Sequence, residues 1–276
     1  MGRRKLFCEL SPFTYRLSVC KGRTIRRLRN LRVRRFARER REELLPVVVY
    51  AQRTLMRRRL GNVEMQLQEN KVINLNLAAP KVSGVVIKPG EIFSFWELVG
   101  ACKAREGYRE GLVISNGRPA RGIGGGMCQM TNLIHWLVLH TPLDIVEHHH
   151  HDGLDLFPDY GRQIPFGTGT SIMYNYLDYR FQNNTGQEYQ LILSTTEEYL
   201  CGEIRTSVPL PVKYHIGVEN ERFVRVDGEV FRAGQVFRRC VDRASGAELE
   251  RKLIKENWAK VMYDSALIPA ALLREE

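Results

Sequence analysis

The stretch Arg121-Gly-Ile-Gly-Gly-Gly-Met-Cys-Gln129 places three consecutive glycines just before a methionine and a cysteine. Behind it, the segment from Met127 to His140 repeats apolar residues at helical spacing, which predicts a buried helix. These apolar residues are Met130, Leu133, Ile134, Leu137 and Val138. Thr141-Pro142 ends the segment, because the residue before a proline is pushed out of the helical region. Cys128 is therefore predicted in the first turn of a helix that follows a loop almost without side chains.

The position of Cys128 favours a chemical role. The first turn of a helix carries unpaired N–H groups and the positive end of the helix dipole, so a cysteine there is expected to have a lowered pKa. Glycines let a substrate backbone approach closely, and the N–H groups of Gly124, Gly125 and Gly126 are candidate oxyanion donors. At the start of the same helix, Gln129 and Thr131 are candidate substrate contacts. The simpler alternative is a small core cysteine after a flexible turn.

Basic residues are concentrated at one end of the chain. The 276 residues suffice for one large domain or two modest ones, and the 43% apolar share supports a real core. Residues 1–60 hold 19 Lys and Arg against four acidic residues, giving +15, whereas the remainder carries −4. We therefore expect a basic helical arm over 1–62, a core domain over 63–205 and a β-rich region over 206–276.

Cysteine spacing and hydropathy limit the cellular context. The six cysteines show no C-x-x-C pair, which argues against a disulfide framework or a zinc finger. The basic N-terminus has no apolar segment of signal-peptide or membrane-span length behind it. We therefore expect a cytoplasmic protein, with peripheral association at the inner face of the membrane as an option for the basic arm.

Residues 23–60 are predicted to form two basic helices with a break at Leu44-Leu45-Pro46. The first carries an incomplete apolar stripe among arginines, and the second runs from Val47 to Leu60. Such a surface favours an anionic partner, either membrane lipid or an acidic polymer. The alternative is a solvated helical face. Nucleic acid is disfavoured as a partner because aromatic residues are not interleaved as stacking platforms.

The rest of the chain predicts strands around the cysteine helix. One helical period followed by several strands with short connections predicts an α+β domain. In it, the Cys128 helix packs on an antiparallel sheet built from residues 143–205. The predicted strands are Tyr108–Ser115 with a turn at Asn116-Gly117, Leu143–Val146, Ile172–Gln182, Tyr189–Thr195, Leu200–Arg205, Arg222–Val226 and Glu229–Arg232 around Asp227-Gly228, Gln235–Arg243 and Glu248–Ile254.

A run of four histidines, His148 to His151, follows Glu147 and the strand before it. In an extended strand alternate residues share a face. Glu147, His149 and His151 then lie on one side, and His148 and His150 lie on the other. His135 is a poor candidate base for Cys128, because it lies two helical turns further on, ~10 Å along the axis. A base for Cys128 is therefore expected from the histidine run.

These motifs, in this order and spacing, resemble the VanW family over roughly residues 70–205. The matching residues are Pro89-Gly90-Glu91-Ile-Phe93-Ser94-Phe95, Gly107-Tyr108, Gly124 to Gln129, Ile145-Val146-Glu147 with a downstream histidine, and Asp178 to Thr185. Some exported members of the family act as L,D-transpeptidases that join peptidoglycan stem peptides through a cysteine thioester. The resemblance implies Cys128 as the nucleophile and His151 or His149 as the base. Gln163 stands where many members have an aspartate after Gly-Arg.

The resemblance thus implies a cell-wall or glycopeptide-resistance protein. We expect a cysteine-dependent acyl transferase or peptidase that acts on a peptidoglycan precursor or stem peptide without a cofactor. One alternative is a zinc-dependent peptidase that uses the His148–His151 cluster, with Glu147, His149 and His151 on one strand face. Another is a non-catalytic binder of the same peptides. The glycine loop lacks both the P-loop and the dinucleotide spacing, which disfavours a nucleotide enzyme.

Overall fold

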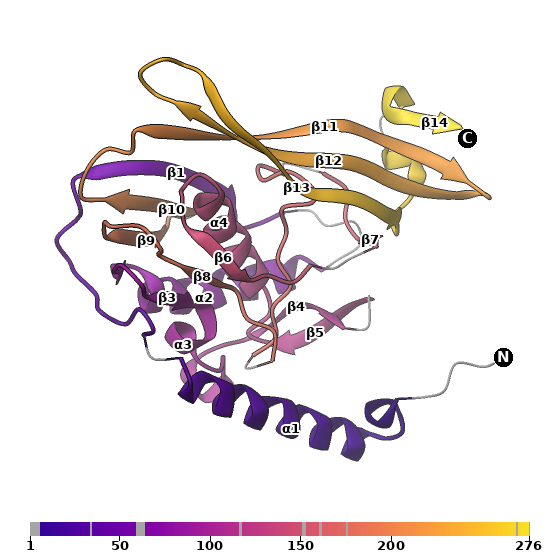
Figure 1. The fold of residues 1–276 in the computed structure, drawn as a ribbon. Coiled ribbons are helices and arrows are strands. Elements are labelled where there is room, and N and C mark those ends of the chain that lie inside the picture. The colour runs from indigo at the N-terminus through magenta and orange to yellow at the C-terminus, as the bar shows by residue number, and fades with distance from the viewer. Residues whose placement is uncertain are drawn as a thin grey trace.

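The computed structural model describes residues 6–33, 35–58, 64–115, 118–150, 153–159, 162–174, 176–268 and 270–275. It is an α+β fold (Figure 1). In chain order the helices are α1 (Pro12–Leu31), α2 (Met65–Val82), α3 (Phe95–Val99) and α4 (Met127–Leu139), with short 3-10 turns at Phe7–Glu9, Ala104–Glu106, Ser265–Leu267 and Ala270–Leu272. The strands are β1 (Val47–Leu55), β2 (Val85–Ile87), β3 (Ile92–Ser94), β4 (Glu110–Ser115), β5 (Arg118–Ile123), β6 (Asp144–Glu147), β7 (Leu154–Asp155), β8 (Arg180–Gln182), β9 (Tyr189–Thr195), β10 (Tyr199–Thr206), β11 (Val212–Val226), β12 (Glu229–Asp242), β13 (Glu248–Val261) and β14 (Leu273–Glu275).

The core is an antiparallel sheet in the order β1-β10-β9-β2 with two helices packed on it. Helix α4 packs on β1 and β10, and α2 packs on β9 and on α4. The apolar spacing that predicted α4 is confirmed, since Met130, Leu133, Ile134 and Leu137 are all fully buried. The sheet differs from the expected one because β1 and β2 come from outside residues 143–205.

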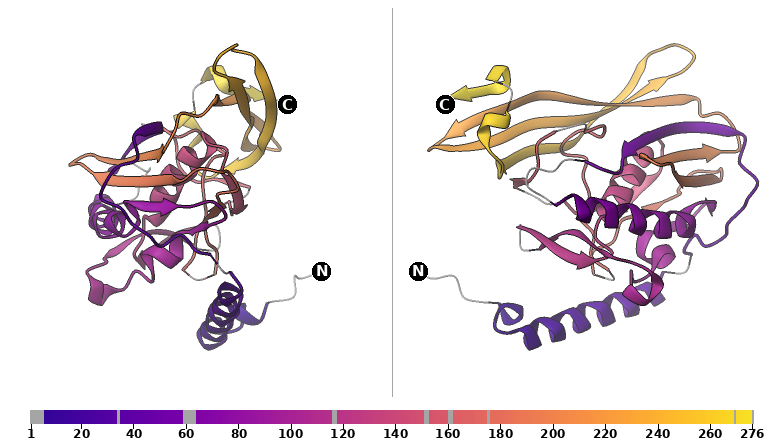
Figure 2. Two further views of the ribbon diagram at one scale, coloured as in Figure 1. Left: turned by 60° about the vertical axis from the view of Figure 1, so that its left-hand side comes forward. Right: turned by 180° about the vertical axis from the view of Figure 1, so that it is seen from behind.

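Three long strands make a second antiparallel sheet, β11-β12-β13, to which β14 and β7 add short parallel edges. The predicted hairpin is confirmed: Asp227 and Gly228 join β11 to β12 with φ values of 50° and 77°, the left-handed conformations that a tight hairpin needs. Figure 2 shows this sheet at one end of the molecule and α1 at the opposite end, with the core sheet between them.

The predicted second basic helix is wrong, because Val47–Leu55 is strand β1. Its start is rich in β-branched residues, and it pairs antiparallel with β10 from Val47↔Thr206 to Leu55↔Tyr199. Pairing in the core sheet outweighs the basic residues that made the segment look like a continuation of the arm. The helical part of the basic segment is thus α1, which begins at Pro12 behind a capping box formed by Ser11 and Thr14.

The predicted strand over Ile172–Gln182 is mostly wrong, because only Arg180–Gln182 form a strand, β8. β8 lies between β3 and β6 in a small antiparallel sheet. The residues before it turn back on themselves, with a backbone hydrogen bond of 2.9 Å from Met173 N–H to Leu177 O. The β4–β5 hairpin is as predicted, although its turn at Asn116-Gly117 lies outside the described residues. No helix in the described parts of the chain has the length and apolarity to cross a bilayer.

A glycine in the β4–β5 hairpin and a glycine in the loop before α4 are in direct backbone contact. A Cβ added to Gly111 in β4 would lie 2.7 Å from the carbonyl oxygen of Gly125, and one added to Gly125 would lie 2.7 Å from the Gly111 Cα. Neither distance is tolerated by real side chains, so the two backbones can touch only because both residues are glycine.

The Gly125→Ala variant should therefore be less stable to urea than the wild type by about 1–3 kcal/mol, the usual cost of overpacking. Gly217→Ala is the matched control, because a Cβ there meets nothing within 4 Å. Equal midpoints for the two variants would show that the contact between Gly111 and Gly125 is not tight.

Candidate functional site

The glycine loop before α4 is held by α2. Asn74, fully buried on α2, donates through Nδ2 to the carbonyl oxygens of Gly125 (2.9 Å) and Arg109 (3.0 Å). It accepts the Arg109 N–H through Oδ1 at 2.8 Å. Gly126 then caps α4 with φ 102°, a conformation that favours glycine. One buried amide side chain thus fixes both the β4–β5 hairpin and the loop that positions Cys128.

A cavity of about 500 Å³ opens beside the start of α4, between the core and the C-terminal sheet. Its wall includes Cys128 and Gln129 from α4, Gln68 and Lys71 from α2, and His150. The opposite wall comes from residues 162–167 and from Lys255 to Ala259 of β13. The C-terminal sheet, which was expected to form a separate region, therefore completes the site.

A buried ion cluster fixes the rim of this cavity. Arg232 of β12 donates to Asp155 of β7 at 3.3 Å and to Glu221 of β11 at 3.0 Å. Its guanidinium also lies over the ring of Phe166, 4.5 Å from the centroid. The charges of Arg232 and Asp155 are satisfied within the protein, so this part of the wall is structural.

Cys128 is half-buried and lines the cavity, as a nucleophile must. The expected lowering of its pKa is not found. Burial raises the pKa of the Cys128 thiol, and a backbone hydrogen bond from Ile172 only partly offsets this. Desolvation penalises the thiolate more than the backbone hydrogen bonds at Ile172 and at Cys128 itself favour it. In the ligand-free protein the thiol is therefore protonated at neutral pH and needs a base to become nucleophilic.

The three glycines differ in their relation to the cavity. The N–H groups of Gly124 and Gly125 already donate to the carbonyl oxygens of Arg109 (2.9 Å) and Gly122 (3.1 Å). Gly126 lines the cavity. Of the three glycines predicted as oxyanion donors, only Gly126 therefore remains a candidate.

The two predicted substrate contacts on α4 also differ. Gln129 lines the cavity and donates through Nε2 to the carbonyl oxygen of Leu55 at 2.7 Å, which ties α4 to the end of β1. Gln163 accepts the Leu55 N–H at 2.8 Å and lines the same cavity. Thr131 is fully buried, and its hydroxyl donates to Cys128 O at 3.2 Å. Thr131 is thus a helix-packing residue in this structure, whereas Gln129 is placed to meet a ligand.

The histidine run divides between two environments, as its alternation predicted. His150 lines the cavity with Cys128, and its ring lies 4.0 Å from that of His148. Burial and His150 lower the pKa of His148 to about 4, so its imidazole is neutral and donates from Nε2 to Gly169 O at 3.1 Å. His149 points to the other side, and His151 lies outside the described residues. The structure therefore brings His150, and not His149, to the wall of the cavity that Cys128 also lines.

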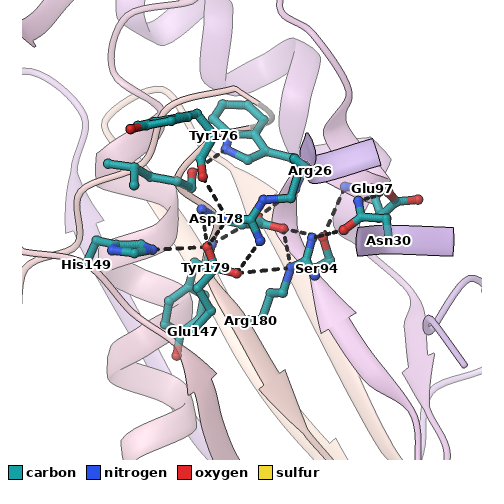
Figure 3. Close-up of polar contacts among 12 residues, drawn as sticks. Arg26, Asn30, Ser94, Glu97, Glu147, His149, Tyr176, Asp178, Tyr179 and Arg180 are labelled. Atoms are coloured by element: carbon teal, nitrogen blue, oxygen red, sulfur yellow. Dashed lines mark hydrogen bonds and ion pairs between the residues drawn. The ribbon is translucent and has the colours of Figure 1, made fainter. Parts of the chain in front are cut away.

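His149 belongs to a polar cluster between α1 and the core (Figure 3). Its Nε2 bonds Glu147 Oε1 at 3.0 Å, and Glu147 also accepts both guanidinium nitrogens of Arg26 at 2.5 and 2.6 Å. Burial opposes ionisation of Glu147, yet the hydrogen bond from Arg26 prevails and lowers its pKa. Arg180 pairs with the buried Asp178 at 2.7 Å in the same cluster. The cluster docks α1 and keeps His149 away from the cavity.

Glu147 already pairs with Arg26, and this pairing bears on the alternative hypothesis of a zinc site. Both of its carboxylate oxygens accept from Arg26, an arrangement in which Glu147 does not compete well for a cation. Among the described residues, no three His, Cys, Asp or Glu side chains lie together as metal ligands. His151 and Asp152 are outside that set, so zinc stays an alternative hypothesis.

Two cavity residues escaped the sequence reasoning. Gln68 and Lys71 lie three residues apart on α2, and Asn74 follows after another three. All three are buried on a helix whose other buried residues are largely apolar. This polar stripe at helical spacing was the signal that could have found them.

The fold and the cavity define an α+β protein in which a cysteine at a helix start opens onto a cavity closed by a second sheet. Sequence comparison agrees with the motifs: the family described as VanW like protein matches residues 70–205. The chain is 33% identical, over 80% of each chain, to the vancomycin B-type resistance protein VanW of Enterococcus faecalis (strain ATCC 700802 / V583). It therefore belongs to the VanW family.

A second relative covers less of the chain. The uncharacterized protein YoaR of Bacillus subtilis (strain 168) is 30% identical over 41% of this chain and 36% of its own length. No solved structure matches.

The raised pKa of Cys128 predicts how the ligand-free protein reacts. The rate of alkylation of Cys128 by iodoacetamide should have a pH midpoint above the value of about 8.5 for a free cysteine, because the reactive thiolate forms late. Peptide-resolved mass spectrometry at a series of pH values measures this midpoint. A midpoint at or below 7 would mean that the helix start, and not burial, governs the thiol.

Proposed function

We propose that this protein is a cell-wall accessory enzyme that transfers or hydrolyses acyl groups of peptidoglycan stem or precursor peptides through Cys128. The observation that carries the proposal is that the thiol of Cys128 and the imidazole of His150 line one cavity, at the positive end of a helix. The size of the cavity, about 500 Å³, suits a short peptide segment. Membership of the VanW family, with a relative named for vancomycin resistance, supports the cell wall as the context.

The proposed reaction begins when His150 accepts the proton of the Cys128 thiol. The thiolate attacks the carbonyl carbon of a peptide bond, and the carbon–nitrogen bond breaks with proton return from the imidazolium to the leaving amine. A thioester at Cys128 remains. An amine of a second peptide, or water, then attacks the thioester and gives its proton to His150, which restores the thiolate and releases the product.

Burial of the thiol fits this order of events. The pKa of Cys128 is raised in the ligand-free state, so idle thiolate is not exposed to oxidants or stray electrophiles. A bound peptide that adds hydrogen-bond donors near the thiol, or that presses His150 toward it, would favour ionisation only when substrate is present. The backbone of Gly126 is the group at hand to hold the oxyanion, because the N–H groups of Gln129 already donate to Leu55 O, Thr54 Oγ1 and Gly126 O.

The direct test is incubation of the purified protein with a tetrapeptide and with a pentapeptide stem, followed by intact-protein mass spectrometry. We expect an acyl adduct that maps to Cys128 and is absent in Cys128→Ala. Removal of the general base in His150→Ala should slow acylation ~10²–10⁴-fold, whereas His149→Ala is the matched control and should acylate at a rate near that of the wild type.

Other outcomes of this experiment would favour the alternative functions. Binding of the peptide without any adduct would leave a non-catalytic binder of cell-wall peptides. Peptide cleavage that survives Cys128→Ala and stops with a chelator would instead support a zinc peptidase built on the histidine run. Loss of activity in His149→Ala with full activity in His150→Ala would reverse the assignment of the base.

A further inference from the structure

Lys71 is a buried side chain that has no anionic partner among the described residues. Its side chain is 6% exposed, and its ammonium group donates to Gln68 Oε1 at 2.7 Å. In the described parts of the chain it forms no ion pair with a carboxylate. The charges that act on it, Arg57 and Arg58, are also positive, and together with burial they lower the pKa of Lys71 to about 7. An ammonium in this position is held at a cost unless an anion joins it.

Gln68 offers a second donor at the same place. The side chain is 1% exposed, and its Oε1 accepts from both Lys71 Nζ (2.7 Å) and the Arg58 N–H (3.3 Å), which fixes the orientation of the amide. Within the described residues, its Nε2 is buried and has no hydrogen-bond partner. Buried donors that stay unpaired are uncommon and often point to a missing ligand.

Both side chains lie beside the nucleophile. Gln68, Lys71 and Cys128 line the same cavity. The stem of Lys71 crosses Gly126 so closely that a Cβ added to Gly126 would lie 2.8 Å from the Lys71 Cδ. The stem of Lys71 therefore packs against the residue that caps α4, which brings its positive charge to the same end of that helix as the helix dipole.

We propose that Lys71 and Gln68 form a subsite for a carboxylate of the ligand that reacts at Cys128. A carboxylate there would accept from the two open protons of the Lys71 ammonium and from Gln68 Nε2, which satisfies the remaining donors of these two side chains. The identity of that ligand as a cell-wall peptide rests on the proposed function. In such a peptide, the carboxylate is that of the amino acid released when the thioester forms.

The subsite can be tested without any catalytic activity. Iodoacetate and iodoacetamide alkylate the same thiolate, but only iodoacetate carries a carboxylate, so the ratio of their rates at Cys128 cancels the amount of thiolate. We expect the ratio of the iodoacetate rate to the iodoacetamide rate to be on the order of ten-fold higher in the wild-type protein than in Lys71→Met. This is the effect of one unit charge at several ångströms in a partly wet cavity. Lys81→Met, on the same helix but paired to Glu106, is the control and should leave the ratio unchanged.

The wild-type protein supplies a second measurement that does not depend on a variant. As pH rises through about 7, the Lys71 ammonium loses its proton, so the ratio should fall, although Arg57 and Arg58 keep their charges. A ratio that is flat with pH and unchanged in Lys71→Met overturns the subsite. If a stem peptide forms an acyl adduct but the ratio does not depend on pH or on Lys71, the proposed function stands and the subsite is refuted. If the ratio depends on Lys71 but no stem peptide forms an adduct, the subsite stands and the proposed function is refuted.

A separate observation concerns α1, which contacts the protein through polar side chains and carries apolar side chains on its exposed face. The side chains that face the protein are polar: Arg26 bonds Glu147, and Asn30 bonds Glu97 at 2.7 Å and accepts from Arg180 at 2.8 Å. The opposite side carries exposed apolar residues. They are Phe13 (69% exposed), Leu17, Leu28 and Leu31 (81% exposed), which fall on one face at 3.6 residues per turn.

Basic residues flank this apolar face on both sides. Arg16 and Arg27 lie along one edge and Lys21 along the other, and all three are exposed. Figure 2 shows α1 at the edge of the molecule, with the face away from the core uncovered. An apolar stripe between rows of cations is the pattern of a helix that lies in the interface of an anionic membrane.

We infer that α1 docks this protein on an anionic lipid surface through the face of Phe13, Leu17, Leu28 and Leu31. Co-sedimentation with vesicles of phosphatidylglycerol should exceed that with phosphatidylcholine and should weaken as salt is raised. Leu28→Ser combined with Leu31→Ser should lower vesicle binding on the order of ten-fold, because two apolar side chains that would be buried in the lipid are lost. Leu249→Ser, at an exposed leucine on β13, is the control. Equal binding by the double variant, or equal binding to both lipids, overturns this inference.

Discussion

The contact between the backbones of Gly111 and Gly125 is the constraint on which the site depends. A Cβ on either residue would lie 2.7 Å or less from the other backbone, so the β4–β5 hairpin can lie against the loop before α4 only if both residues are glycine. Asn74 then bonds both segments from α2. These contacts fix where α4 begins, and the start of α4 fixes where Cys128 meets the cavity. The glycines thus serve packing first, and only Gly126 among the three lines the space a ligand would occupy.

The chemistry of the cavity follows from a balance between burial and charge. Burial raises the pKa of the Cys128 thiol and lowers the pKa of the Lys71 ammonium, so both groups are driven toward their neutral forms. A ligand carboxylate would favour charged Lys71, and His150 offers a place for the thiol proton. Under the proposed function, the ligand-free protein is a resting state, and the charges on Cys128 and Lys71 develop together when a suitable anion enters the cavity.

Much of the fold could be predicted, since strong local signals agree with the tertiary structure at α4, at the Asp227-Gly228 hairpin, and at β9 and β10. Prediction was wrong where long-range pairing prevailed. The Val47–Leu55 segment carries a basic composition, yet it completes the core sheet beside β10. The alternation of the histidine run was correct, but a sequence does not say which face meets Cys128. That choice depends on Arg26 of α1, which holds Glu147 and His149 on the far side. Lys71 and the wall from β13 were missed because their proximity to Cys128 arises only on folding.

The central claim is that Cys128, His150 and Lys71 act on one ligand in one cavity, and a crystal structure of the protein alkylated with iodoacetate tests it most directly. The carboxymethyl group on Cys128 carries a carboxylate a short reach from the sulfur. The account predicts that this carboxylate accepts from Lys71 Nζ and Gln68 Nε2, and that a ring nitrogen of His150 contacts the sulfur directly or through one water. A carboxymethyl group turned to solvent, with Lys71 bonded only to Gln68 and His150 remote from the sulfur, would contradict it.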